Sequence, residues 1–461
     1  MTTARIRGHR RRPRRPAAAA VPRLLTGLFA AGLAVAACSP RLEPATPPDR
    51  PHVLLISLDT LRADRLGSYG HTRDTSPFLD SLADGGTRFA RSFVNTHGTP
   101  PSHATLFTSL YQESHRVSHG ILDGQVDHRM PDELPTLPQV LLDAGYHTVA
   151  VTGGGFMSAD FGWRRGFERF YEEEHADGVD KLFRAIRSRD DGTPIFAFFH
   201  TYEIHSPYDP AAPYRTLWGE LDAEVDATSE GLKARSRRRP FHLSDPERES
   251  LLKLYDAGIR YTDDTLRELF GRLDAIGFLD HALVIVTSDH GEEFGEHGSL
   301  LHPATLYEEL VSVPLIISGP GVDVGKVDDR LVSTIDIAPT IYGYLDVRAP
   351  RWTGGADLLE PYAPGRGEVF LQYGDLLYGV RTPNFKLIEN EKTGNVKLFD
   401  LQRDPAEQRN IARTRPFVVE TLTARLEQWR SSVPRFAARS DEAPALSDER
   451  LDELRALGYV D

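Results

Sequence analysis

The sequence predicts an α/β protein with a doubly wound, mostly parallel sheet flanked by helices, followed by a smaller C-terminal α+β subdomain. Short apolar runs rich in β-branched and aromatic residues recur along the 461-residue chain, and such runs are typical of parallel strands buried on both faces. Amphipathic segments at 135–144 and 247–276 lie between these runs and predict the covering helices. The expected strands are at 52–59, 147–153, 194–202, 281–289 and 313–319.

A positively charged leader opens the sequence. Residues 1–37 contain eight arginines and no acidic residue, and they end in an apolar run of 14 residues. Such a run is shorter than the roughly 20 residues that span a bilayer, and it is typical of a secretory signal. It ends in VAAC at Cys38, the only cysteine of the chain, and this ending is similar to the lipoprotein box of bacteria. We therefore expect 1–37 to be a lipoprotein signal peptide and Cys38 to be lipidated; a buried or stray cysteine is the alternative.

The expected lipid anchor implies a place in the bacterial cell envelope. Ser39, after the cysteine, gives no inner-membrane retention signal, so a periplasm-facing anchor in the outer membrane is favoured over the inner membrane. Loss of the eight positive charges of the leader takes the formal net charge from −13 to −21. A protein this acidic is not expected to bind nucleic acid.

Composition divides the rest of the chain into a tether, two structured parts and a tail. Residues 38–50 are rich in proline and read as a tether. The alternating strands and helices occupy 51–360, and short strand patterns followed by an Arg/Glu-rich helix near 416–430 make 361–435 the smaller subdomain. We treat 436–461 as a C-terminal tail. Within the first part, the polar and basic segment 210–245 is expected to be an exposed insertion, with a lid or a substrate-steering role as the alternative.

Acidic residues and histidines gather where the predicted strands end. In open α/β sheets, ligands bind outside the carboxyl ends of the strands, so these side chains are expected to meet. Each alone has a simpler explanation, since an aspartate can cap a helix and Asp-His-Gly can form a turn. The residues are Asp59 after the first run, Glu203 and His205 after the third, and Asp289, His290, His297 and His302 after the fourth.

The stretch NTHGTPPSHATLFTSLY, from Asn95 to Tyr111, adds a hydroxyl to this set. Thr99 precedes two prolines and a helix-like pattern, so it could simply cap a helix. A hydroxyl at a helix N-terminus also lies where an anion or an alkoxide is favoured.

Five ordered motifs resemble the sulfatase family of the alkaline phosphatase superfamily: ISLDTLRADRLGSYG, TPPSHATLFTSLY, VTSDHGEEFGEHG, TLYEELVSVPLIISGPG and VRTPNFKLI followed by KLFDLQRDPAEQRNIA. The resemblance spans roughly 51–412, and the ending LRALGYV is also familiar from relatives. It implies a metal-dependent ester hydrolase that acts on an anionic ester of phosphorus or sulfur. It indicates the fold more specifically than the substrate.

The resemblance assigns roles residue by residue. Asp59, Asp289 and His290 match metal ligands, and Thr99 falls at the position of the nucleophile, whose hydroxyl also touches the metal. His103 stands where many sulfatases have an arginine that supports the nucleophile. His205 and His302 match groups that hold substrate oxygens or protonate the leaving group. His297 is a weaker candidate for substrate binding, and Glu203 could be a ligand or could orient His205.

Three departures from the family pattern bear on metal and substrate. Asp59 is followed by Thr60 rather than by a second acid, and His290 replaces the usual asparagine, which favours zinc or manganese over calcium. Thr99 stands where sulfatases oxidise a cysteine or serine to an aldehyde hydrate, whose second hydroxyl expels sulfate. Threonine cannot give that aldehyde, so phosphate or phosphonate esters are favoured over sulfate esters.

Other functions remain open from the sequence. A sulfate ester hydrolase is the nearest alternative, and a transferase that moves a phospho-alcohol onto envelope glycans or lipids is another. Transferases of that kind generally have several membrane spans, whereas no second long apolar segment occurs in the sequence. A binding lipoprotein on a decayed enzyme scaffold is disfavoured by the retained site residues.

The histidines His97, His115 and His119 are interpreted as ordinary loop or surface residues, and Asp263 and Asp264 as solvated or structural.

Overall fold

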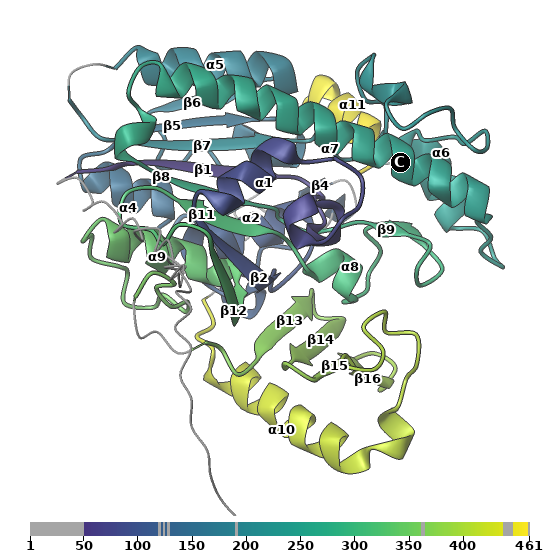
Figure 1. Cartoon of the computed structure of the whole chain (residues 1–461). Coiled ribbons are helices and arrows are strands. Elements are labelled where there is room, and N and C mark those ends of the chain that lie inside the picture. Colours follow the sequence, from purple (N-terminus) through teal and green to yellow (C-terminus); the bar gives the residue numbers. More distant parts are fainter. Residues whose placement is uncertain are drawn as a thin grey trace, which may run out of the picture. The chain divides into compact units, whose positions relative to one another are not determined.

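A mixed eight-stranded sheet forms the centre of the structure (Figure 1). Its strand order is β12-β2-β11-β8-β1-β7-β5-β6, and neighbouring strands run parallel except at β11, which is antiparallel to both β8 and β2. The predicted α/β class is confirmed, and one of the five predicted strands runs in the opposite direction. The strands are β1 (His52–Leu58), β2 (Thr87–Phe93), β5 (His147–Thr152), β6 (Arg169–Glu172), β7 (Ile195–Thr201), β8 (Ala282–Thr287), β11 (Leu315–Ser318) and β12 (Lys326–Ser333).

The computed structural model describes residues 50–118, 121–122, 125–126, 130–189, 192–360, 365–436 and 446–459. All of them belong to the unit Pro44–Asp461. The predicted signal peptide, Cys38 and all of the tether except Arg50 lie outside the described residues, as does His119. Within the described part, no helix is both long and apolar enough to span a bilayer.

The alternation of side chains along β1 explains why this strand is apolar throughout. Leu54 and Ile56 belong to one buried cluster, whereas Val53 and Leu55 belong to another on the opposite face of the sheet. Helices cover both faces, so neither set of side chains can be polar.

Two groups of helices supply those layers (Figure 1). One face packs against α1 (Pro77–Asp84), α5 (His175–Arg187) and the long α7 (Asp245–Asp274), which contribute to the first cluster. The other face packs against α2 (Thr99–Thr108), α4 (Leu137–Asp143) and α9 (Ile337–Tyr344). The helices α4 and α7 lie where 135–144 and 247–276 predicted them.

Asp263, inside α7, was interpreted from the sequence as either solvated or structural, and the structure gives it a structural role. Its carboxylate accepts hydrogen bonds from the backbone N–H groups of Phe78 (2.9 Å) and Leu79 (2.8 Å), in the first turn of α1. Because those N–H groups have no partner within their own helix, Asp263 joins α1 to α7.

The C-terminal subdomain is an antiparallel sheet with one helix. Its strands are β13 (Val369–Tyr373), β14 (Leu377–Arg381), β15 (Phe385–Asn390) and β16 (Val396–Asp400), in that spatial order. Helix α10 (Pro416–Ser432) covers the sheet, and Trp429 stacks on Phe370 with ring centroids 4.8 Å apart. The small C-terminal subdomain predicted from the sequence is therefore present.

Shorter elements complete the structure. Helix α6 (Ser229–Ser236) lies inside the predicted insertion, and its Leu232 is only 1% exposed, so part of that segment packs on the protein rather than forming an exposed loop. Helix α11 (Asp448–Ala456) lies within the predicted tail, and its Leu454 is buried in the second core cluster. The remaining short elements are α3 (Gln112–His115), α8 (Glu308–Val311), β3 (Ile121–Leu122), β4 (Gln125–Val126), β9 (Glu293–Phe294) and β10 (Leu300–Leu301).

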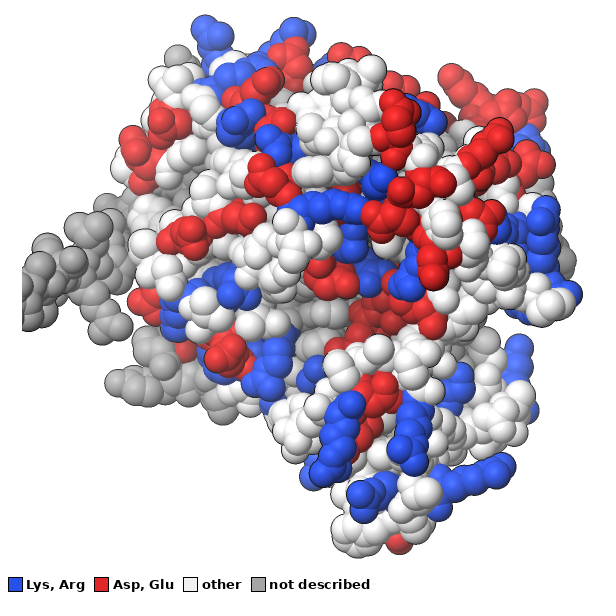
Figure 2. Space-filling model, turned by 45° about the vertical axis from the view of Figure 1, so that its right-hand side comes forward, with Lys and Arg blue, Asp and Glu red and all other residues white. Residues whose placement is uncertain are grey.

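Charged side chains of both signs are interspersed over the face shown in Figure 2. Many are paired; for example, the buried Asp256 accepts from Arg65 and Arg73. Although the protein is acidic overall, many of its acidic side chains are therefore neutralised by a neighbouring arginine or lysine.

Candidate active site and metal centre

The candidate site lies at the C-terminal ends of three neighbouring strands, β8, β1 and β7. Asp59 follows β1, His200 lies near the end of β7, and Asp289 and His290 follow β8. The register of the parallel strands aligns their last residues, so the segments that follow them meet at one edge of the sheet. Ligand sites of open α/β sheets occur at this edge.

Three buried atoms converge there, and the described residues offer none of them a hydrogen bond: Oδ1 of Asp59, Oδ2 of Asp289 and Nε2 of His290. The His290 Nε2 atom lies 3.9 Å from Asp59 Oδ1 and 3.6 Å from Asp289 Oδ2. Its other ring nitrogen, Nδ1, lies 2.9 Å from the carbonyl oxygen of Gly291, which can only accept. Nδ1 therefore carries a hydrogen, and Nε2 faces the two carboxylates, where a neutral ring would offer its lone pair to a cation.

The electrostatics of this cluster fit a divalent cation. Burial raises the pKa of Asp59, and burial together with the Asp59 charge raises the pKa of Asp289. Burial lowers the pKa of His290, but the two carboxylates outweigh it and raise that pKa overall. A cation held by two carboxylate oxygens and one imidazole nitrogen would satisfy all three unpaired atoms.

Thr99 is held directly beside these ligands. It is the first residue of α2, after Gly98 in a left-handed conformation (φ 94°), and the prolines that follow occupy the first turn. Its side-chain hydroxyl donates to Asp59 Oδ2 at 3.2 Å and lies 3.1 Å from the hydroxyl of Tyr459. Thr99 is 1% exposed, and its side chain does not cap the helix, whose N-cap residue is Gly98; its hydroxyl lies at the cluster of candidate ligands instead.

Thr60, after the first ligand, has an unusual backbone conformation. Its φ is 58°, in the left-handed region that β-branched residues rarely occupy. Two contacts hold it there: its N–H donates to Asp289 Oδ1 at 3.3 Å, and its carbonyl accepts from the hydroxyl of Tyr255 at 2.6 Å. Backbone strain of this kind is maintained where the surrounding structure demands it, and here Thr60 joins the loop of Asp59 to the loop of Asp289, two candidate ligands.

His103 and His200 lie beneath the cluster, and both are fully buried. His103 Nδ1 lies 2.8 Å from the carbonyl of Thr99, and its Nε2 lies 3.0 Å from Ser57 Oγ. His103 thus supports the backbone of Thr99 rather than its hydroxyl. His200 Nε2 lies 3.2 Å from Asp59 Oδ2, so His200 can orient that ligand. Burial lowers the pKa of both histidines to about 4, and both rings are neutral at pH 7.

His205 and His302 lie side by side, with ring centroids 5.3 Å apart, and the ring of His302 lies 4.7 Å from that of His290. His205 Nδ1 lies 2.6 Å from the carbonyl of Ser206, so Nδ1 carries the hydrogen and Nε2 faces the site. Burial, followed by the effect of His302, lowers the pKa of His205 to about 4. His302 Nδ1 contacts Oε1 of the buried Glu292 at 3.1 Å, which fixes the orientation of its ring.

Glu203 is not brought into this cluster. Its backbone N–H donates to Thr201 Oγ1 at 3.2 Å, and its carboxyl lies near Glu174 and Asp209. Burial and these two acids raise the pKa of Glu203 to about 7.

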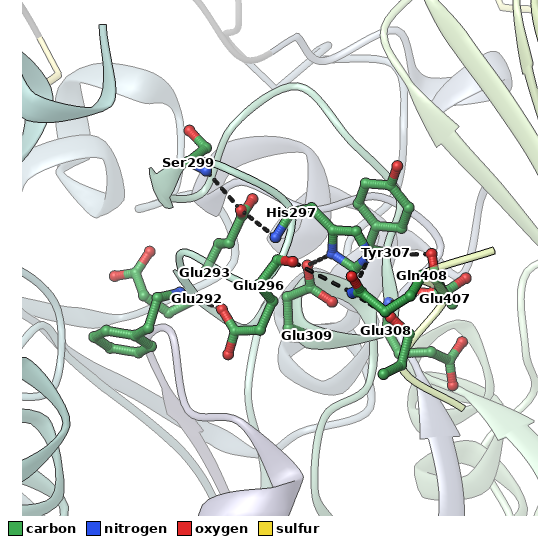
Figure 3. Close-up of polar contacts among 12 residues, drawn as sticks. Glu292, Glu293, Glu296, His297, Ser299, Tyr307, Glu308, Glu309, Glu407 and Gln408 are labelled. Atoms are coloured by element: carbon green, nitrogen blue, oxygen red, sulfur yellow. Dashed lines mark hydrogen bonds and ion pairs between the residues drawn. The ribbon is translucent and has the colours of Figure 1, made fainter. Parts of the chain in front are cut away.

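His297 also lies in a different network, shown in Figure 3. Its Nδ1 contacts Glu309 Oε1 at 2.6 Å, its Nε2 lies 3.3 Å from the carbonyl of Glu407, and its ring stacks on Tyr307 at 3.5 Å between centroids. These contacts occupy both ring nitrogens and connect His297 to the C-terminal subdomain.

Several residues of the site were not identified from the sequence. His200 lies inside a strand pattern, Glu292 is one of several acids in one turn, and Tyr459 is separated from Thr99 by 360 positions. His97 and His115 were interpreted as loop or surface residues, but both are 0% exposed. His97 stacks on Tyr373 with centroids 4.7 Å apart, and its ring lies 6.3 Å from that of His290.

Comparison with known proteins places this geometry in a family. The family described as Sulfatase matches residues 51–347, and the family described as N-sulphoglucosamine sulphohydrolase, C-terminal, matches residues 295–432. The multifunctional alkaline phosphatase superfamily protein PehA of Trinickia caryophylli is 26% identical over 475 residues, which cover 79% of this chain and 91% of PehA. An N-acetylglucosamine-6-O-sulfatase of Bacteroides thetaiotaomicron is 22% identical over 489 residues, which cover 83% of this chain and 86% of that enzyme.

A solved structure has the same fold. The phosphonate monoester hydrolase of Agrobacterium radiobacter superposes with a TM-score of 0.68 at 22% identity, over 83% of this chain and 96% of that one. Because the Sulfatase match covers more than half of the sequence, the chain belongs to the sulfatase family of the alkaline phosphatase superfamily, whose members are ester hydrolases that use a divalent metal ion.

Proposed function

We propose that this protein hydrolyses phosphate or phosphonate esters with Thr99 as the nucleophile. The observation that carries the proposal is the position of the Thr99 hydroxyl, 3.2 Å from Asp59 Oδ2 and beside three unpaired ligand atoms. A threonine hydroxyl is a weak nucleophile at neutral pH and needs activation by a base or a metal. A cation in this cluster would supply that activation by favouring the deprotonated hydroxyl.

The protein residues have separable roles in this reaction. The Thr99 oxygen attacks the phosphorus atom, and the bond from phosphorus to the alcohol oxygen breaks. His205 and His302 are neutral at pH 7, so Nε2 of one of them would accept the proton that Thr99 gives up. The imidazolium formed would then hold non-bridging oxygens or pass that proton to the departing alcohol. Water then attacks the phosphorus of phosphothreonine, which releases the phosphate or phosphonate and restores the threonine hydroxyl. His103 and His200 act behind the site, on the backbone of Thr99 and on Asp59.

The nature of the nucleophile favours phosphorus over sulfur. A threonine cannot be converted to the aldehyde hydrate that expels sulfate from a covalent intermediate, whereas water can open a phosphothreonine. The similarity to a phosphonate monoester hydrolase agrees with this choice. Hydrolysis of sulfate esters is the second candidate, because an N-acetylglucosamine-6-O-sulfatase is similarly close in sequence. A transferase that uses the same nucleophile would pass the phospho-alcohol group to another alcohol instead of water.

We also propose zinc or manganese as the metal, held by Asp59, Thr99, Asp289 and His290. Calcium prefers six to eight oxygen ligands, whereas a set that includes an imidazole suits zinc or manganese better.

Thr99 substitution tests the nucleophile. Thr99→Ala should lower turnover of nitrophenyl phosphate esters or phosphonates by at least about 1000-fold, because removal of a covalent nucleophile leaves only binding and electrostatic stabilisation. Thr99→Ser should keep measurable activity, and Thr421→Ala on α10 serves as the matched control. Near-full turnover by metal-loaded Thr99→Ala would contradict the nucleophile assignment. Faster cleavage of nitrophenyl sulfate than of every phosphorus ester by the wild type would contradict the substrate class.

We further propose that the protein works in the bacterial cell envelope, anchored through lipidated Cys38. The proposal rests on the arginine-rich leader and on the short apolar run before the only cysteine.

A further inference from the structure

Tyr459 reaches the candidate site from the C-terminal segment. Its hydroxyl oxygen lies 3.1 Å from Thr99 Oγ1 and 3.1 Å from His205 Nε2. Its ring packs on Phe156 with centroids 4.2 Å apart, and it lies 5.4 and 6.1 Å from the rings of His205 and His302. A phenol therefore sits between the proposed nucleophile and the two histidines.

The sequence around Tyr459 explains how it is aimed at the site. Helix α11 ends at Ala456, and Gly458, two residues further on, has a left-handed φ of 82°. The Gly458 N–H donates to the Arg455 carbonyl at 2.9 Å, and the Tyr459 N–H donates to the Leu454 carbonyl at 2.7 Å. These two bonds form a Schellman cap, in which glycine at the left-handed position allows the chain to reverse direction. The reversal directs Tyr459 back toward the catalytic domain.

Helix α11 is firmly attached to that domain. The Arg450 guanidinium forms ion pairs with Asp160 (3.1 Å) and Glu172, which come from the loop after β5 and from β6. Leu454 is 0% exposed and belongs to the core cluster on that face of the sheet. A segment held by buried apolar contacts and ion pairs is a fixed wall of the site rather than a loosely attached tail.

The hydroxyl of Tyr459 acts as a donor. Neutral His205 carries its hydrogen on Nδ1, and Thr99 donates its own hydrogen to Asp59, so His205 Nε2 and Thr99 Oγ1 can only accept from the phenol. The single phenol hydrogen goes to one of these two atoms, and the Tyr459 hydroxyl is the donor in either case. A reacting atom attacked by Thr99 would lie about 3–3.5 Å from Oγ1 before reaction. Oxygens bound to that atom would then lie within hydrogen-bond reach of the Tyr459 hydroxyl. A negatively charged oxygen is a stronger acceptor than an imidazole nitrogen.

We propose that Tyr459 is a substrate-binding residue, whose hydroxyl donates a hydrogen bond to an oxygen of the tetrahedral group that Thr99 attacks. The proposal rests on the proposed function for the identity of the nucleophile. It does not depend on whether the group is a phosphoryl, phosphonyl or sulfuryl group, since all three present negatively charged oxygens.

The test is Tyr459→Phe in the full-length chain, which keeps the ring and its contact with Phe156. We expect kcat/KM for the best nitrophenyl ester to fall at least about tenfold, the effect of one hydrogen bond to a charged group. Binding of inorganic phosphate, measured by calorimetry on the metal-loaded protein, should weaken by a similar factor, while the thermal midpoint stays unchanged. The matched control is Tyr344→Phe at the end of α9. It removes a hydroxyl that donates to the Pro320 carbonyl at 2.7 Å.

Two results would overturn the proposal. Unchanged kcat/KM and phosphate affinity in Tyr459→Phe would make the hydroxyl a structural bystander. Faster turnover with tighter phosphate binding would make Tyr459 a plug that blocks the site. If the wild type cleaves only sulfate esters, the proposed function fails, but the same comparison with nitrophenyl sulfate and inorganic sulfate still tests Tyr459.

Discussion

His290 is the residue on which the choice of metal depends most. In the proposed metal site, Asp59 and Asp289 would contribute carboxylate oxygens, which suit almost any divalent cation, whereas the imidazole of His290 would favour zinc or manganese. His290→Asn replaces the nitrogen with an amide oxygen and restores the usual residue of the family. We expect the variant to lose zinc or manganese and to bind calcium or magnesium instead.

Elemental analysis of purified protein measures this change. His242→Asn is the matched control, because the exposed His242 lies in the predicted insertion and the same substitution there should leave the metal content unchanged. Zinc or manganese retained at the wild-type level in His290→Asn would show that the imidazole is not a ligand.

Position after a strand singled out Asp59, Asp289 and His290, and the helix start with the family resemblance added Thr99 and His103. His200 and Tyr459 carry neither signal and were missed. Asp59, Asp289 and His290 could be found because a short apolar run ends just before each of them. His200 could not, since a histidine inside a strand pattern looks like one more strand residue. Tyr459 acts across 360 positions of sequence, and no local periodicity encodes such a contact.

At the scale of elements, the short helix α11 determines whether Tyr459 is in place. Arg450→Ala removes the guanidinium that pairs with Asp160 and Glu172 and leaves these acids facing Glu453 without a counter-charge. We expect kcat/KM to fall toward the value of Tyr459→Phe, and the free energy of unfolding to fall by about 1 kcal/mol, as for partly exposed ion pairs.

Steady-state kinetics with chemical denaturation checks this expectation. The control is Arg455→Ala on the same helix, whose ion pair with Asp452 is exposed on both sides. Wild-type kcat/KM in Arg450→Ala would mean that α11 holds its position without this residue. A loss shared equally by the control would point to the helix rather than to the ion pairs.

Strand prediction succeeded where burial is greatest. The five predicted runs correspond to β1, β5, β7, β8 and β11, whereas β2, β6 and β12 were missed. The outermost strand β12, KVDDRLVS, is polar along its exposed half, so it lacks the continuous apolar pattern of a central strand. The direction of β11 could not be read either, because an apolar run has the same composition whether it pairs parallel or antiparallel.

For the whole molecule, the contact between the catalytic part and the C-terminal subdomain combines apolar packing with buried ion pairs, among them a cluster around Lys386. Lys386 on β15 is 0% exposed, and its Nζ lies 2.9 Å from Glu308 at the start of α8 and 2.9 Å from Glu407. Figure 3 shows that both acids border the network of His297 and Glu309. The histidine that the sequence suggested for substrate binding therefore lies where the two parts of the chain meet.

Lys386→Met tests how much this cluster stabilises the molecule. Methionine fills similar space, but Glu308 and Glu407 would then be buried side by side without a cation. Burial already raises the pKa of Glu407 above its ordinary value, and Lys386 partly offsets that rise. Without the lysine we expect a loss of about 3–5 kcal/mol in the free energy of unfolding at pH 8. The loss should be smaller at pH 5.5. Without Lys386, the pKa of the buried carboxyls rises further in the folded state, so one of them binds a proton at that pH and the repulsion between the two falls.

Urea unfolding at both pH values measures this loss, with the exposed Lys392→Met as the matched control. A loss below about 1 kcal/mol at pH 8 would mean that this cluster contributes little to the stability of the molecule. A loss of equal size at both pH values would mean that repulsion between the two carboxylates is not its cause.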